Sequence, residues 1–251
     1  MGARFAMTRD RQVSWQPWIL LTFALGVASA GCLLMIVLRV AVTGSIRYTF
    51  LLWNLFLAWI PYCLALIVRR IVAGRRASTD TPITAGIKPL AVLLALAWLF
   101  FYPNAPYILT DFIHVIRIPV RVEPPHPLIT ENALLWYDII LNSAFAFIGH
   151  IIGLISLLIL HRTFRRKYDH RWGWAFTVVA TTLGGYGIYL GRFERLNSWD
   201  IARDPVRTLR IAFANLVNLK AVLVSLCFAL FIFLTYLAVY FLYETARKTR
   251  A

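Results

Sequence analysis

Six stretches of roughly 20 apolar residues constrain this chain more than any other feature of its sequence. They occupy residues 18–38, 48–68, 89–109, 134–160, 173–190 and 221–243. A helix of about 20 residues spans the ~30 Å hydrocarbon core of a bilayer. Backbone groups that face lipid must be satisfied within the helix, and a closed β-barrel would show short alternating segments instead. The sequence therefore predicts an all-α, polytopic membrane bundle with six transmembrane helices.

The composition excludes the main alternatives. Hydrophobic residues make up 60% of the chain and charged residues 15%, against about 25% charged residues in a typical soluble domain. A soluble enzyme, a disordered chain and a disulfide-stapled module are therefore excluded. Cys32, Cys63 and Cys227 lie inside apolar stretches and lack metal-binding spacing. We expect one transmembrane domain at 18–243, between basic cytoplasmic tails at 1–17 and 244–251.

The basic residues predict both partners and topology. The formal net charge is +15, which in a soluble protein would indicate nucleic acid. Here Lys and Arg fall mainly in short loops, so the lipid bilayer and anionic lipid headgroups are the expected partners, and nucleic acid is not. Alternate loops and tails carry 16 Lys and Arg on one side and 10 on the other. Both termini should then be cytoplasmic, and most acidic residues fall on the outer side, where we expect the site.

One face of the fourth apolar stretch carries an ionisable residue. Asp138, Asn142, Phe145, Gly149 and Gly153 share this face at helical spacing. The two glycines permit close approach of another helix, so the face should point into the bundle. A carboxylate inside a span indicates a functional site. The alternative is a wetted interfacial aspartate that caps the start of the helix.

The third apolar stretch ends in a proline-containing segment, residues 102–111. Two prolines three residues apart should break the helix, either to line a cavity or to form an exit turn. We expect an amphipathic interfacial helix after the break, ended by Pro119. Asp111 and His114 lie at i and i+3 on it, where they could supply two metal ligands or contact solvated headgroups. With Asp138, these two are the candidate catalytic residues, and Asn104 is a candidate substrate contact.

The fifth stretch ends in a glycine-rich segment that leads into several polar residues. Arg192 and Arg195 are one turn apart and could hold a phosphate or carboxylate, or pair with nearby acidic residues. The other candidate substrate-binding residues near this end are Tyr189, Asn197 and Asp200. Asp204 and Pro205 predict the start of a second interfacial helix on the outer side.

Three segments resemble one known family. They read Tyr102-Pro-Asn-Ala-Pro-Tyr-Ile-Leu-Thr-Asp111, Trp136-Tyr-Asp138 and Gly185-Tyr-Gly-Ile-Tyr-Leu-Gly-Arg-Phe-Glu-Arg-Leu-Asn-Ser-Trp-Asp200. The chain is similar, from roughly its second to its sixth span, to bacterial multi-pass membrane proteins catalogued as domain of unknown function 1361. The resemblance implies a protein of the bacterial cytoplasmic (inner) membrane. It implies no catalytic assignment and adds no mechanism.

Three functions remain open at this point. An enzyme would act at the outer leaflet on a lipid-linked or anionic amphiphilic substrate, with Asp138 or Asp111 as general base and His114 as acid or metal ligand. A permease would use Asp138 as its coupling carboxylate, although the inner halves of the spans look nearly all apolar. An accessory subunit would dock an extracytoplasmic partner. The sequence determines no cofactor, metal ion, substrate or oligomeric state.

The enzyme hypothesis makes one geometric prediction. We expect one outer pocket that holds Asp111, Asp138, Arg192 and Asp200, with Asn104 and Tyr189 in its wall.

Overall fold

The computed structural model describes residues 16–73, 87–117 and 130–249, and these contain helices and turns but no strand. The long helices are α1 (Gln16–Thr43), α2 (Phe50–Ala73), α3 (Ile87–Phe101), α6 (Glu131–Lys167), α7 (His170–Phe193) and α10 (Leu219–Lys248). The short ones are α4 (Asn104–Tyr107), the 3-10 helix η1 (Ile108–Phe112), α5 (Ile113–Arg117), α8 (Asp200–Arg203) and α9 (Pro205–Asn215). The predicted all-α class is confirmed.

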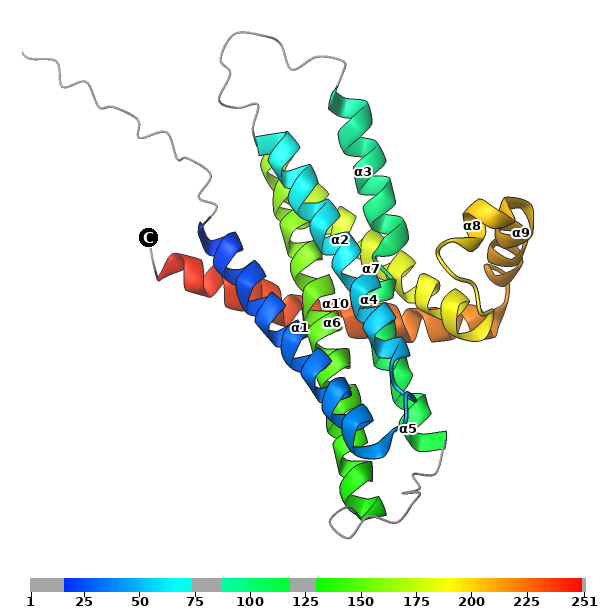
Figure 1. The fold of residues 1–251 in the computed structure, drawn as a ribbon. Helices are drawn as coiled ribbons and strands as arrows, with labels where there is room; N and C mark the ends of the chain where they lie inside the picture. Colours follow the sequence, from blue (N-terminus) through cyan, green and yellow to red (C-terminus); the bar gives the residue numbers. More distant parts are fainter. Residues whose placement is uncertain (1–15, 74–86, 118–129, 250–251) are drawn as a thin grey trace, which may run out of the picture.

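Helix α6 is the centre of the bundle. It contacts α1, α2, η1, α7 and α10, and 72% of its most apolar window is buried, against 22% for α1 and for α10. In Figure 1, α2 and α3 lie on one side of α6, while α10 crosses it and pairs with α7. Helices α8 and α9 project to one side. The outer helices therefore keep most of their surface free, as lipid-facing helices do.

Five helical segments of the described chain are long and apolar enough to cross a membrane, namely Trp18–Thr43, Phe50–Val72, Pro89–Ile116, Glu131–Lys167 and Leu219–Lys248. Four of the six predicted spans lie within them, and the second, 48–68, overlaps Phe50–Val72 except for its first two residues. The remaining predicted span, 173–190, is the fifth in chain order and lies in α7. This helix has 24 residues but is not one of the five segments. Its glycine, threonine, tryptophan and tyrosine residues lower its hydropathy.

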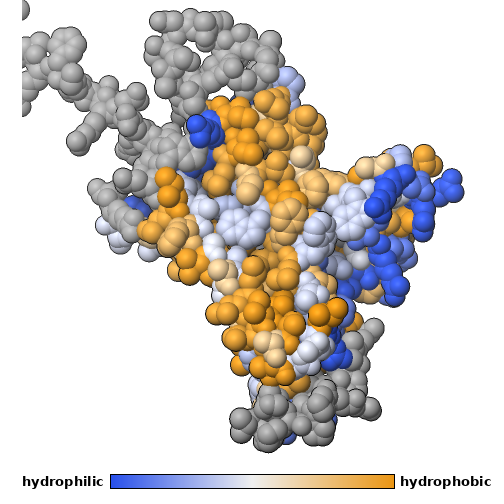
Figure 2. Space-filling view, in the orientation of Figure 1, coloured by the Kyte–Doolittle hydropathy of each residue, from blue (hydrophilic) through white to orange (hydrophobic). Residues whose placement is uncertain are grey.

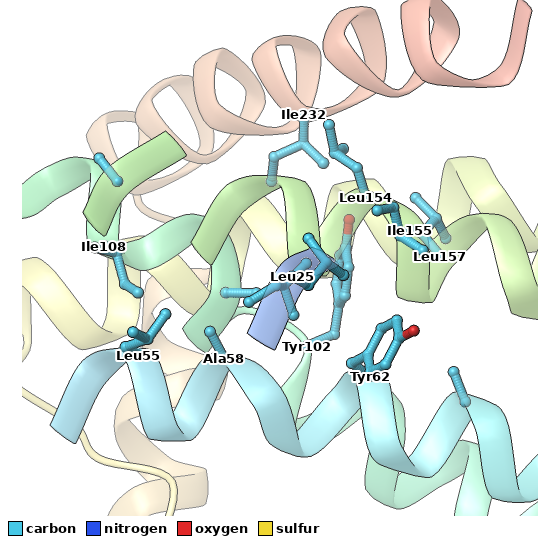
Figure 3. Packing of buried hydrophobic residues seen from close by; sticks show 14 of the residues in the cluster. Leu25, Leu55, Ala58, Tyr62, Tyr102, Ile108, Leu154, Ile155, Leu157 and Ile232 are labelled. Atoms are coloured by element: carbon cyan, nitrogen blue, oxygen red, sulfur yellow. The ribbon is translucent and has the colours of Figure 1, made fainter. Parts of the chain in front are cut away.

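The apolar residues are distributed as in a protein that sits in lipid. Large side chains such as Leu20, Phe23 and Leu93 are 63–70% exposed. Figure 2 shows a mostly hydrophobic surface over the long helices and hydrophilic residues gathered over α8 and α9. Inside, α6 packs against α2 on one side and α10 on the other, and the buried residues between them include Tyr62 of α2 and Ile232 of α10 (Figure 3). An apolar surface of this extent marks contact with a membrane.

The proline-containing segment interrupts the third span without turning the chain away. Residues 102–103 form a turn, but Pro103 (φ −57°, ψ −26°) and Ile108 keep right-handed helical angles. The Tyr107 N–H donates to the Pro103 carbonyl at 3.0 Å. The expected break is present as a distortion, and the run Pro89–Ile116 continues through it. Pro119, the expected end of the following helix, lies outside the described residues.

The glycine face of α6 points inward, as predicted. A Cβ added to Gly153 would lie 2.8 Å from the Ala105 Cβ, and one added to Gly149 would lie 2.5 Å from Ile108 Cδ1. The interrupted segment therefore packs directly on this face. Further along the chain, Gly185 of α7 lies against the backbone of α10 in the same way.

Candidate functional site

Two arginine–carboxylate pairs lie at the end of the bundle where α1 and α7 end and α2 and α6 begin. The first joins α1 to α6. Arg39 donates from Nε to Asp138 Oδ1 at 2.6 Å and from Nη2 to Asp138 Oδ2 at 3.1 Å. The two side chains are 4% and 0% exposed. Helix α6 begins at Glu131 with Thr130 as its N-cap, so the alternative of a wetted, capping Asp138 is wrong.

Neighbouring side chains enclose the Arg39–Asp138 pair and shield it from solvent. The Arg39 guanidinium stands over the Tyr48 ring, 4.6 Å from its centroid, and Asn142 Nδ2 donates to the Asp138 carbonyl at 2.8 Å. Burial, with the Asp138 carboxylate nearby, raises the pKa of Tyr48 to about 12. The phenol is therefore neutral at physiological pH, and its hydroxyl has no hydrogen-bond partner among the described residues.

The second pair joins the interrupted segment to α7. Arg192 Nη2 donates to Asp111 Oδ1 at 2.6 Å, while its Nε and Nη2 reach Thr110 Oγ1 at 2.9 and 2.5 Å. Asn54 of α2 donates to the other oxygen, Asp111 Oδ2, at 2.7 Å. The Arg192 guanidinium also stacks 4.6 Å over the Tyr107 ring. Three elements, α2, η1 and α7, thus meet at one carboxylate.

A cavity of about 580 Å³ opens beside this second pair. Its apolar wall comes from α2, α3 and α7 and includes Leu57, Leu96, Leu99, Phe100, Leu183 and Leu190. Its polar end includes Asn104, Asp111, His114, Arg192, Asn197 and Ser198. Leu96, Phe100 and Leu183 are 42–58% exposed, so the apolar side of the cavity reaches the lipid-facing surface of the bundle.

Of the predicted site residues, five line this cavity. Asn104 Nδ2 donates to Ser198 Oγ at 3.0 Å, which ties the segment after α7 to α4. His114 lies with Nδ1 3.1 Å from the carbonyl of Asp111 and with its ring against Phe50, at a centroid distance of 4.8 Å. Asn197, Asp111 and Arg192 complete the five.

The other four predicted residues do not line the cavity. Tyr189 is buried and donates to Asn215 Oδ1 at 3.2 Å, while Asp200 Oδ2 accepts the Asn197 N–H at 2.7 Å and so closes a turn. Arg195 is exposed and has φ of 55°, in the left-handed region. Asp138 is sequestered by Arg39. The single pocket expected from the sequence is therefore divided, because each buried carboxylate has its own arginine.

The described residues bring together no group of three or more His, Cys, Asp and Glu side chains that could hold a metal ion. Asp111 and His114, the spacing that suggested two ligands, use the carboxylate and one ring nitrogen in other contacts. Metal dependence and any cofactor stay undetermined.

The partner of Asp138 was missed from the sequence. We expected the first span to end at Leu38 and assigned Arg39 to a loop, but α1 continues to Thr43. The signal was available, because the apolar residues Val40, Ala41 and Val42 follow Arg39. An arginine enclosed by apolar residues within a helix predicts a carboxylate from another helix.

Polar groups also occur deeper in the bundle than the sequence indicated. His161 Nδ1 lies 2.8 Å from Thr177 Oγ1, and Trp98 Nε1 donates to Ser156 Oγ at 3.3 Å. The hydroxyls of Tyr102 and Tyr236 are buried without a hydrogen-bond partner in the described part of the chain. The inner halves of the helices are therefore less apolar than the sequence indicated, and they weigh less against a permease.

These features define a multi-pass helical membrane protein with a buried polar centre at one end of the bundle. The chain matches, over residues 53–235, the family described as "Protein of unknown function (DUF1361)", and it belongs to that family. The matched range contains Asp111, Asp138 and Arg192 and leaves Arg39 outside. No curated protein and no solved structure matches the chain.

Proposed function

We propose that this protein binds an amphiphile, a molecule with an apolar chain and a polar headgroup, in the cavity between α2, α3 and α7. The observation that carries the proposal is that one side of the cavity is apolar and the other end is polar. An apolar wall that reaches the lipid-facing surface continues into a polar end at the Asp111–Arg192 pair. A lipid-linked substrate has both kinds of surface, an apolar chain for the wall that reaches lipid and a headgroup for the few polar groups at the other end.

Arg192 is the residue best placed to meet the headgroup. Its side chain is 19% exposed, and its Nη1 makes no hydrogen bond within the described residues. Asp111 is 3% exposed, and both its carboxylate oxygens are occupied. We therefore assign Asp111 a positioning role that holds the guanidinium in place, and Arg192 the contact with an anionic headgroup such as a phosphate. An enzymatic step at this site, with His114 as acid or base, extends the same proposal.

The cavity should lie at the outer face of a bacterial inner membrane, and the bundle should have six spans with α7 as the fifth. The bias of 16 to 10 in Lys and Arg supports this orientation. Helix α9 would then lie in the outer interface. Val206, Leu209 and Phe213 are 46–67% exposed along one side of it, as suits an interfacial helix.

Truncated fusions to a phosphatase that is active only outside the cytoplasm test this topology. Fusions after Ala77 and Tyr168 should be inactive, and fusions after Pro124 and Ser198 should be active, because alternate loops lie on opposite sides. An inactive fusion after Ser198 would remove α7 from the spans. An active fusion after Ala77 would reverse the orientation and place the cavity on the cytoplasmic side.

Filling the cavity tests the binding itself. Leu96→Trp places an indole in the cavity, at a position that is 58% exposed and so tolerates the larger side chain. We expect the purified variant to retain about tenfold less of the amphiphile that the wild-type protein carries out of the membrane, measured by mass spectrometry. Arg192→Gln should weaken retention by a similar factor, because a charge-assisted hydrogen bond is lost.

Leu93→Trp is the matched control. Leu93 lies on the same helix about one turn away, is 63% exposed and does not line the cavity. It should retain the amphiphile at the wild-type level. Equal retention by Leu96→Trp and Leu93→Trp, with both variants folded, would contradict the proposed site.

A further inference from the structure

The opposite end of the bundle carries a second concentration of charge. Here α2, α6 and α10 end and α1 and α7 begin. In the described residues this end carries Lys88 at the start of α3 and nine further Lys and Arg: Arg69, Arg70, Arg162, Arg165, Arg166, Lys167, Arg171, Arg247 and Lys248. Two acidic residues accompany them, Asp169 and Glu244. Most of these cations are exposed, as is usual for basic residues at a membrane surface. Arg69 and Arg162, however, are only 7% and 8% exposed.

Neither acidic residue forms a hydrogen bond or an ion pair with Arg162. Asp169 caps α7 by accepting the N–H of Trp172 at 3.0 Å. Glu244 lies 3.0 Å from Arg165 Nη2 through one carboxylate oxygen and 3.9 Å from Arg247 Nη1 through the other. Within the described residues Arg162 has no hydrogen bond and no ion pair; Glu244 attracts it only from a distance, while Arg166 and Arg247 repel it. A buried guanidinium without an acceptor is costly, so this arrangement calls for an anion.

Aromatic rings hold the two buried arginines at fixed positions. The Arg162 guanidinium stands 4.3 Å over the Tyr243 ring, and that of Arg69 stands 4.8 Å over the Trp18 ring. The two rings are themselves stacked, 6.4 Å apart at their centroids. Contacts among four helices, α1, α2, α6 and α10, therefore fix the two cations at the end of the bundle opposite the cavity. Stacking orients the Arg162 guanidinium without using its N–H donors, which have no oxygen acceptor within the described residues.

From this arrangement we propose that Arg162, with Arg69, binds the phosphate group of an anionic lipid at the end of the bundle opposite the cavity. A phosphodiester supplies oxygen acceptors and a negative charge, and the described residues offer Arg162 neither a hydrogen-bond acceptor nor an ion pair. Trp18 and Tyr243 lie where aromatic residues accompany lipid headgroups at membrane interfaces. The site is separate from the proposed amphiphile cavity and does not depend on it.

The full-length protein, purified in a neutral detergent, tests the proposal by lipid titration with thermal unfolding and native mass spectrometry as readouts. Phosphatidylglycerol should bind about tenfold more tightly than phosphatidylcholine and raise the unfolding temperature more, because the zwitterionic lipid carries no net charge. This comparison needs no variant, and equal effects of the two lipids would overturn the proposal. Inorganic phosphate alone should raise the unfolding temperature little. An equal rise would keep the arginine site and assign it to soluble phosphate.

Arg162→Gln should lower the affinity for phosphatidylglycerol about tenfold, whereas Arg171→Gln should stay within about twofold of wild type. Arg171 is the matched control, because it is exposed at the same end and its substitution removes the same charge. Without lipid, Arg162→Gln should unfold near the wild-type temperature, because the loss of stacking on Tyr243 is offset by relief of repulsion with Arg166 and Arg247. A merely structural arginine would give the reverse, and a lower unfolding temperature with unchanged lipid affinity would overturn the proposal.

Discussion

Asp138→Asn is expected to destabilise the protein by about 3–5 kcal/mol, enough to reduce its accumulation in the membrane sharply. The substitution leaves Arg39, whose side chain is 4% exposed, without its carboxylate. Arg39→Gln should cost a similar amount, because the Asp138 carboxylate is then left buried and unpaired. Thermal unfolding of the purified variants, together with their membrane levels, measures both effects.

The double variant Arg39→Met with Asp138→Leu separates charge from shape. Replacing a buried ion pair by apolar residues of similar size is often neutral or stabilising, so this variant should recover most of the lost stability. Glu131→Gln is the matched control, because Glu131 lies on the same helix but is exposed. It should change stability by less than about 0.5 kcal/mol. A double variant no better than the single ones would mean that the pair does more than satisfy two charges.

Gly185→Ala is expected to cost about 1–3 kcal/mol, at the upper end of that range, because the added methyl group meets backbone atoms. A Cβ at this position would overlap the Ser225 carbonyl oxygen and lie 2.6 Å from the Ala229 nitrogen. Backbone atoms cannot rotate away as side chains can, so α7 and α10 would have to separate. Because α7 carries Arg192, amphiphile retention should fall together with the unfolding temperature.

Gly26→Ala provides the comparison. Gly26 lies in α1, and a Cβ there would meet no atom within 4 Å. Alanine is favoured over glycine in a helix by about 1 kcal/mol, so this variant should be as stable as the wild type or slightly more so. Equal stability of Gly185→Ala and Gly26→Ala would show that α7 and α10 are not packed as tightly as described.

The sequence predicted features that depend on length and period along one segment. Apolar length located the six long helices, and helical spacing correctly placed Gly149 and Gly153 on an inward face. Asp204 followed by Pro205 marked the start of α9, where Asp204 Oδ1 accepts the Arg207 N–H at 3.0 Å. These features are local, so the residues that determine them are neighbours in the chain.

The pairing of charges between helices was not predictable in the same way. Asp111 and Asp138 could each have met Arg192, since all three were expected near the same end of the bundle. The choice depends on which helices pack together. Helix α1 lies against α6 and brings Arg39 to Asp138, whereas α7 lies against α4 and brings Arg192 to Asp111. The cavity arises from the same packing, so its position could not be read from any one span.

The link between α1 and α6 has a consequence for how the protein is made. Arg39 and Asp138 are 99 positions apart in the chain. At about 5–20 residues per second, roughly 5–20 s of translation separate the two residues. During that interval the newly inserted first helix carries an arginine whose carboxylate has not yet been synthesised. Insertion of α1 therefore precedes its docking, and the arrival of α6 is the step that commits the first helix to its place.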